Sequence, residues 1–251
     1  MNNVSTSFIL TFIAGFSTML GTILIFIKVK NIKKFICGSL SFASGVMICV
    51  SITDLVPESL ILLKTNFNTF LTLFLCFVFI VLGIVISMLI DYYLPTDNFV
   101  YENNKLFKVG IISMLAIILH NIPEGIATFV AGTSNKTLAI SLTIAIALHN
   151  IPEGISIAVP IYYSTKNKLK ALFYTFVSAI SEPFGALTAY LFLSRFVGNT
   201  LLGILFAIIA GIMLNISFCE LLPTAKKYNY KYINNIFFVI GVIFMLLKFL
   251  I

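Results

Sequence analysis

Charge is scarce in this sequence. Only 10% of the 251 residues are charged and 60% are hydrophobic, whereas roughly a quarter of the residues of an ordinary soluble protein are charged. A soluble domain with so little charge could not cover its apolar surface, so most of the chain is expected to face lipid or other helices. Because most lysines lie between apolar stretches, the net charge of +7 does not indicate nucleic acid as a partner.

Paired cysteines and a cleavable leader are also lacking. The four cysteines are scattered through apolar segments without a C-x-x-C pair, which favours small buried hydrophobes over disulfides or thiolate metal ligands. The N-terminal MNNVSTSF has no basic residue before the first apolar run, and no A-x-A-like site follows that run. We therefore expect a retained first helix rather than a signal peptide.

Long apolar stretches dominate what is present. A helix needs about 20 such residues to cross a bilayer, and eight stretches of this kind can be identified. They are 5–27, 36–62, 69–93, 107–132, 136–163, 169–193, 199–224 and 232–251. The gaps between them are short, so the sequence predicts one all-α, polytopic membrane domain over residues 1–251 with eight transmembrane helices.

Basic residues are divided unevenly between the two sets of connections. One set contains Lys28, Lys30, Lys33, Lys34, Lys105, Lys108, Lys166, Lys168, Lys170, Lys226, Lys227 and Lys231. The opposite set contains only Lys64, Lys136, Arg195 and Lys248. Because cytoplasmic loops are enriched in lysine and arginine, we predict a multi-pass protein of the cytoplasmic membrane with both termini extracytoplasmic.

Several acids and both histidines lie inside the predicted spans. The acids are Asp54, Glu58, Glu124, Glu153, Glu182 and Glu220. The three central glutamates, Glu124, Glu153 and Glu182, would together cost roughly 9 kcal/mol if ionised without compensation. No lysine or arginine lies at their depth, so a bound cation is the simplest compensation.

The hexapeptide HNIPEG occurs twice, at 120–125 and at 149–154. The histidine and glutamate of each copy are four residues apart and share a helix face. Both copies start near the middle of their spans, and the connection between these spans is short, so the motifs should meet at one depth on antiparallel helices. The predicted primary metal site consists of His120, Glu124, His149 and Glu153.

The residue types of the motif suit a transported transition metal. Imidazole and carboxylate are ligands for Zn²⁺ and its first-row neighbours, and Asn121 and Asn150 offer weaker amide oxygens that allow release. Pro123 and Pro152 free backbone carbonyls one turn earlier, and the glycines permit close helix approach. Glu182, within SEPFGA at 181–186, lies near the same depth among small residues.

A second repeated pattern occurs in the second and seventh spans, which end in DLVPES at 54–59 and in ELLPTA at 220–225. Because these spans run in opposite directions, Asp54 and Glu58 should approach the outer surface and Glu220 the inner one, where the ion would arrive and leave. Helices 1–3 and 6–8 then form an inverted repeat around the helix 4–5 pair, an arrangement known in secondary transporters.

These residues resemble the ZIP family of metal transporters, in particular its bacterial branch. The segments HNIPEGIATFVAG, ALHNIPEGISIAVP, SAISEPFGA and ELLP look like its helices four to seven. The resemblance implies eight helices with outer termini, inward movement of metal and a central site for one or two ions. The ligands it implies are His120, Asn121, Glu124, His149, Asn150, Glu153 and Glu182. The histidine-rich loop between helices three and four that many members carry is missing here, which argues against metal capture by that loop.

There are three alternatives to a zinc carrier: an intramembrane metalloprotease, a secondary transporter of another solute, and a purely structural membrane protein. An intramembrane metalloprotease needs H-E-x-x-H, whereas this chain has H-x-x-x-E twice, so an enzyme is not expected. A secondary transporter of another solute could use the glutamates as a proton relay. The sequence also leaves open whether Fe²⁺, Mn²⁺, Co²⁺ or Cd²⁺ is carried besides Zn²⁺ and whether the protein is a homodimer, and it indicates no resident cofactor.

Overall fold

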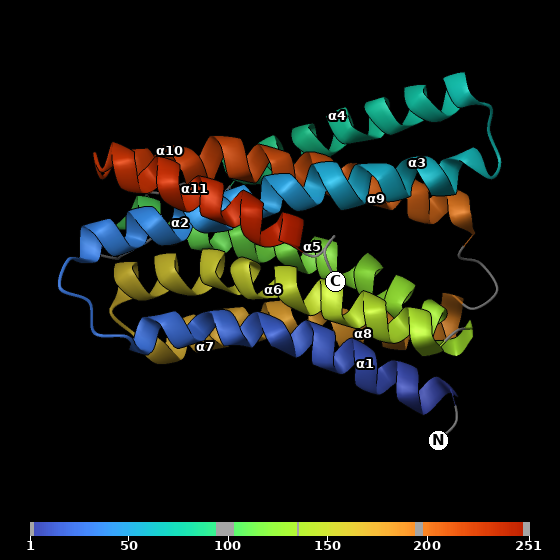
Figure 1. Ribbon diagram of the computed structural model, residues 1–251, viewed down its shortest axis with the longest axis horizontal. Coiled ribbons are helices and arrows are strands. Elements are labelled where there is room, and N and C mark those ends of the chain that lie inside the picture. The colour runs from blue at the N-terminus through green and yellow to red at the C-terminus, as the bar shows by residue number, and fades with distance from the viewer. Residues whose placement is uncertain (1–2, 94–102, 135, 194–197, 248–251) are drawn as a thin grey trace.

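The structure is a computed structural model that describes residues 3–93, 103–134, 136–193 and 198–247, and these residues form helices and no strand. The helices run roughly along one axis as an elongated bundle (Figure 1). In chain order they are α1 (Asn3–Ser17), η1 (Thr18–Phe26), α2 (Ile32–Val50), η2 (Ser51–Leu55), α3 (Val56–Lys64), α4 (Thr69–Tyr93), α5 (Asn104–Ser134), α6 (Lys136–Thr165), α7 (Lys168–Ala179), α8 (Ser181–Thr188), η4 (Ala189–Leu193), α9 (Asn199–Asn215), η5 (Ile216–Leu221), α10 (Leu222–Lys226) and α11 (Lys231–Leu246).

Six helical segments are long and apolar enough to cross a membrane. They are Val4–Phe26, Ile32–Lys64, Thr69–Tyr93, Asn104–Thr133, Leu142–Thr165 and Asn199–Lys226, which correspond to the predicted spans one to five and seven. The predicted sixth span is divided into α7, α8 and η4, and the predicted eighth contains the shorter apolar helix α11. The polar connection at 94–102, Arg195, Lys248 and the outermost terminal residues lie outside the described residues.

Three of the predicted spans change helical geometry just before a proline. Wide turns with i to i+5 hydrogen bonds, η2 and η5, precede Pro57 and Pro223, and a break at Ile180 separates α7 from α8 shortly before Pro183. Proline has no backbone N–H to donate, which favours a wider or broken turn before it, whereas α5 and α6 continue as α-helices through Pro123 and Pro152. The sequence predicted these spans but not the breaks within them.

Helices α5 and α6 pack against each other at the centre, with α8 and α1 against α5, and η1 and α2 against α6. The close approaches rest on reciprocal glycines. A Cβ on Gly125 of α5 would overlap the Glu182 carbonyl, and one on Gly185 of α8 would overlap the Ile122 carbonyl. Three other helix contacts also have a glycine on each side: Gly21 with Gly154, Gly45 with Gly241, and Gly83 with Gly211. Glycine therefore sets the spacing in all four helix pairs.

Three of the four lysine-rich connections lie at one end of the bundle, where η1 leads into α2, α6 into α7 and α10 into α11 (Figure 1). Side-chain contacts join two of them, since Asn31 Nδ2 donates to the Tyr230 hydroxyl at 3.4 Å and Lys34 lies over the Tyr230 ring. At the opposite end Asn66 Nδ2 donates to Thr200 Oγ1 at 2.9 Å. The charge asymmetry of the sequence therefore corresponds to the two ends of the folded molecule.

Candidate metal centre

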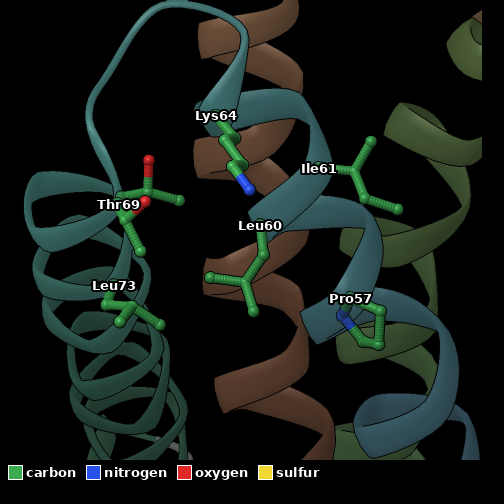
Figure 2. Close-up of a pocket in the computed structure, with 7 residues that line it drawn as sticks. Pro57, Leu60, Ile61, Lys64, Thr69 and Leu73 are labelled. Carbon is green, nitrogen blue, oxygen red and sulfur yellow. The ribbon is translucent and has the colours of Figure 1, made fainter.

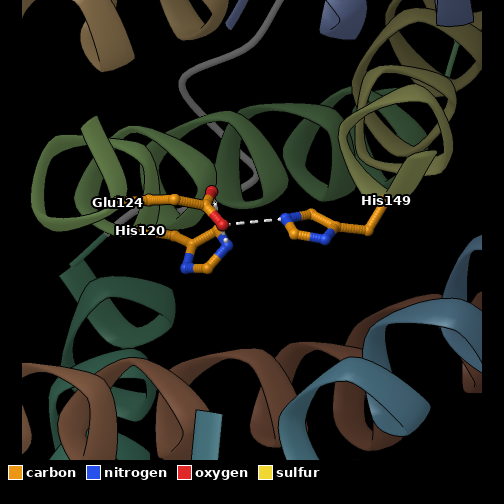
Figure 3. A group of neighbouring side chains, drawn as sticks. All are labelled: His120, Glu124 and His149. Carbon is orange, nitrogen blue, oxygen red and sulfur yellow. Dashed lines mark hydrogen bonds and ion pairs between the residues drawn. The ribbon is translucent and has the colours of Figure 1, made fainter. Parts of the chain in front are cut away.

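Two histidines and a glutamate converge between α5 and α6, at the middle of the bundle. His120 and Glu124 come from α5 and His149 from α6, and one ligand atom from each lies within 4.8 Å of the others. The two imidazoles approach the same carboxylate (Figure 3). His149 Nε2 lies 3.0 Å from Glu124 Oε1, and His120 Nε2 lies 3.4 Å from Glu124 Oε2. The two copies of HNIPEG thus meet as the sequence predicted.

Glu153, the acid of the second motif, joins the same group. Its Oε1 lies 3.6 Å from His120 Nε2, and its side chain is almost fully buried. A tetrahedral Zn²⁺ with ligands at roughly 2.0–2.2 Å would hold adjacent ligand atoms about 3.3–3.6 Å apart. The distances from His120 Nε2 to Glu124 Oε2 and to Glu153 Oε1 match this spacing, so each of these pairs has the separation expected of two neighbouring zinc ligands.

The amide nitrogens of the two motif asparagines are bound to other helices. Asn121 Nδ2 donates to the Ser178 carbonyl of α7 at 3.4 Å. Asn150 Nδ2 donates to the Ala14 carbonyl of α1 and to Glu182 Oε2, both at 2.9 Å. Because a backbone carbonyl only accepts hydrogen bonds, these contacts orient each amide and leave its Oδ1 as the free atom.

The predicted ligands hold most of the buried polar atoms that lack a hydrogen-bond partner. Nine of the fourteen such side-chain atoms among the described residues belong to the seven predicted ligands. They are His120 Nδ1 and Nε2, Asn121 Oδ1, Glu124 Oε2, His149 Nδ1, Asn150 Oδ1, Glu153 Oε1 and Oε2, and Glu182 Oε1. Each such atom costs about 1–3 kcal/mol, and a coordinated cation would satisfy the nitrogens and oxygens that point to it. The donor set therefore fits a divalent transition metal.

Two contributors to this arrangement were not assigned from the sequence. The carbonyls of Ala14 and Ser178 hold the two asparagines, and the Ser178 hydroxyl is itself buried without a partner. No side-chain type signals that a backbone carbonyl from a distant helix will orient an amide. The sequence indicated only that small residues surround Glu182.

The acids expected along the route of the ion differ in their surroundings. Asp54, in η2, is partly buried and interacts electrostatically with His149, whereas Glu58 on α3 is exposed. Glu220, in η5, interacts electrostatically with Asp91 of α4. Asp91 Oδ1 in turn lies 2.6 Å from Lys108 Nζ of α5.

A separate pocket of about 370 Å³ lies between α3 and α4 (Figure 2). It is lined by Pro57, Leu60, Ile61, Lys64, Thr69, Thr72 and Leu73. None of the predicted ligands contributes to it, and its lining is mostly apolar. The polar centre between α5 and α6 is therefore a different site.

Comparison with known proteins points to one family. The family profile described as ZIP Zinc transporter matches residues 100–248. The chain is 42% identical to a zinc transporter ZupT of Clostridium perfringens, over 91% of this chain and 90% of that protein. Proteins of the same name from Akkermansia muciniphila and Streptococcus mutans are 37% and 38% identical. The matches cover 97% of this chain and 96% of the former protein, and 89% of this chain and 89% of the latter.

Proposed function

Because the chain belongs to the ZIP family of zinc transporters, we propose that it moves Zn²⁺ across the cytoplasmic membrane into the cytoplasm. It is a membrane transporter and not an enzyme. The observation that carries the proposal is the convergence of His120, Glu124 and His149 within 4.8 Å. The ion is the substrate, and it would exchange part of its water shell for these side chains.

We propose two overlapping ligand sets. The nitrogen-containing set is His120, His149, Glu124 and Glu153, supported by the separations of 3.0–3.6 Å. The oxygen-only set is Asn121, Asn150 and Glu182, whose free oxygens are buried. The carboxylates of Glu124 and Glu153 would join both sets, which would allow one or two ions. The weaker amide ligands would favour release.

The proposal includes one membrane domain over residues 1–251 with eight spans and an inverted repeat. The four glycine contacts support the inverted repeat, because they fall into two equivalent sets. The contact between α2 and α11 corresponds to that between α9 and α4. The contact between α5 and α8 corresponds to that between α6 and η1. Residues 45–57 and 211–223 add a sequence match, G-x-M-x-x-x-S-x-x-[D/E]-L-x-P. Both stretches contain a wide turn before the proline.

The proposed orientation places both termini outside, because three of the four lysine-rich connections share one end of the bundle and such loops are cytoplasmic. Asp54, near His149, would attract the ion from outside with Glu58, and Glu220 would receive it on the inner side. Fe²⁺, Mn²⁺, Co²⁺ and Cd²⁺ are further cargoes to test. A homodimer is the assembly to test, because α4 exposes a long apolar face.

Uptake of ⁶⁵Zn into proteoliposomes, with competing divalent ions and an imposed pH gradient, tests this function. The variant His120→Ala, His149→Ala should lose most zinc uptake while remaining folded, because it removes both nitrogen ligands. Wild-type uptake in this double variant would contradict the assigned site. Absence of both zinc uptake and zinc binding would instead favour a proton-coupled carrier of another solute.

A further inference from the structure

Two segments far apart in the sequence make equivalent contacts, each with residues of the two HNIPEG motifs. They are residues 14–21, AGFSTMLG, and residues 178–185, SAISEPFG. Ser17 Oγ donates to the Ala14 carbonyl at 2.6 Å, and Ser181 Oγ donates to the Ser178 carbonyl at 2.6 Å. In both segments the helix changes geometry next to this serine, since η1 follows α1 and α8 follows the break after α7.

The same two carbonyls hold the asparagines of the metal centre. Ala14 accepts from Asn150 and Ser178 accepts from Asn121. The fourth residue after each carbonyl then packs on a motif glycine. The Glu182 carbonyl lies where a Cβ of Gly125 would be, and the Thr18 carbonyl lies where a Cβ of Gly154 would be. Thr18 therefore occupies, beside the second motif, the position that Glu182 occupies beside the first.

The hydroxyl of Thr18 is not used within its own helix. Thr18 is 0% exposed, and its Oγ1 has no hydrogen-bond partner. The other buried threonines of this span behave differently, since Thr11 Oγ1 donates to the Ser7 carbonyl at 2.9 Å and Thr22 Oγ1 to the Met19 carbonyl at 2.7 Å. A fully buried hydroxyl without a hydrogen-bond partner, at the counterpart of a predicted ligand, is free to contact a bound ion.

We propose that the hydroxyl oxygen of Thr18 is a ligand of the transported cation, opposite Glu182 in the oxygen-only set. This inference rests on the proposed transport function. A neutral oxygen suits this place, because Glu124, Glu153 and Glu182 already supply three buried carboxylates. A fourth carboxylate would hold a divalent ion more tightly and slow its release. With threonine in one segment at the place of glutamate in the other, the site would bind the ion and still release it.

The test compares Thr18→Val, which keeps the shape but removes the hydroxyl, with Thr18→Ser, which restores it. Zinc binding to the purified full-length protein is measured by calorimetry, and ⁶⁵Zn uptake and thermal unfolding are measured on the same variants. Thr22→Val is the matched control, because that hydroxyl is bonded within its own helix. We expect roughly tenfold weaker zinc binding for Thr18→Val, the scale of lost supporting ligands, and values near wild type for Thr18→Ser and Thr22→Val.

Wild-type zinc affinity in Thr18→Val would overturn the assignment of Thr18 while leaving the transport function intact. Equal losses in Thr18→Val and Thr18→Ser would also overturn it, because they would indicate packing rather than an oxygen ligand. Absence of zinc uptake by the wild-type protein would instead refute the transport function, and the role of Thr18 with it.

Discussion

Asn150 Nδ2 donates to Glu182 Oε2 at 2.9 Å and so connects the second HNIPEG motif to α8. The same nitrogen donates to Ala14 of α1. Replacing Asn150 with aspartate removes both donors and places a second carboxylate against Glu182 and a carbonyl. We expect the free energy of unfolding without metal to fall by about 1–3 kcal/mol.

Zinc should recover part of the stability lost in Asn150→Asp, because a divalent cation offsets the added negative charge. Thermal unfolding in detergent with and without Zn²⁺ measures both effects. Asn235→Asp on the exposed face of α11 is the control and should unfold like wild type. An Asn150→Asp protein as stable as wild type without zinc would show that these hydrogen bonds do not support the centre.

Gly125 offers a test of the close contact beneath the site. A methyl group there would overlap the Glu182 carbonyl, so Gly125→Ala should push α8 away and cost about 1–3 kcal/mol of stability. Zinc affinity should fall as well, because Glu182 moves with its backbone. Gly198→Ala is the matched control, since nothing lies within 4 Å of its Cβ position. Similar melting temperatures and zinc affinities for both variants would contradict this account.

The orientation can be tested by thiol labelling in intact cells. In a background lacking the four native cysteines, cysteines at Asn31 and Asn167 should be shielded from an impermeant reagent, because both lie at the lysine-rich end. A cysteine at Asn66, exposed at the opposite end, should be labelled. The reverse pattern would require an inverted topology.

Asp54 is expected to matter for capture of the ion. Its charge acts on His149, so Asp54→Asn should raise the external zinc concentration for half-maximal uptake roughly two- to fivefold, the range of a partly solvated charge interaction. The effect should shrink as salt is added. Kinetics like those of wild type at low ionic strength would leave Asp54 with a structural role only.

Glu220 is expected to act at release instead. Glu220→Gln should lower the maximal uptake rate by a modest factor with little change in the concentration for half-maximal uptake. The physical reason is that the inner carboxylate draws the ion from the centre, beside Asp91 and Lys108. Initial rates over a range of zinc concentrations measure both parameters. A change confined to the half-maximal concentration would place Glu220 on the side of capture.

The sequence by itself determined the class of the protein and the chemistry of its centre. The lack of charge predicts a membrane protein, and the doubled HNIPEG places both histidines and two central glutamates on one face each of neighbouring helices. These properties depend on residue type and on short spacings along one helix, which are local. They could therefore be worked out without the fold, and in the structure His120, Glu124 and His149 do lie together.

Only the tertiary structure decided which atoms of these residues are free and which helices support them. The hydrogen bond from Asn150 to Ala14 and the contact of Thr18 with Gly154 join segments that are distant in the chain. The segments 14–21 and 178–185 share only a serine and a glycine, too little to align by sequence. Side-chain orientation and helix pairing are set by packing of the whole bundle, so the match between Thr18 and Glu182 became visible only in the folded protein.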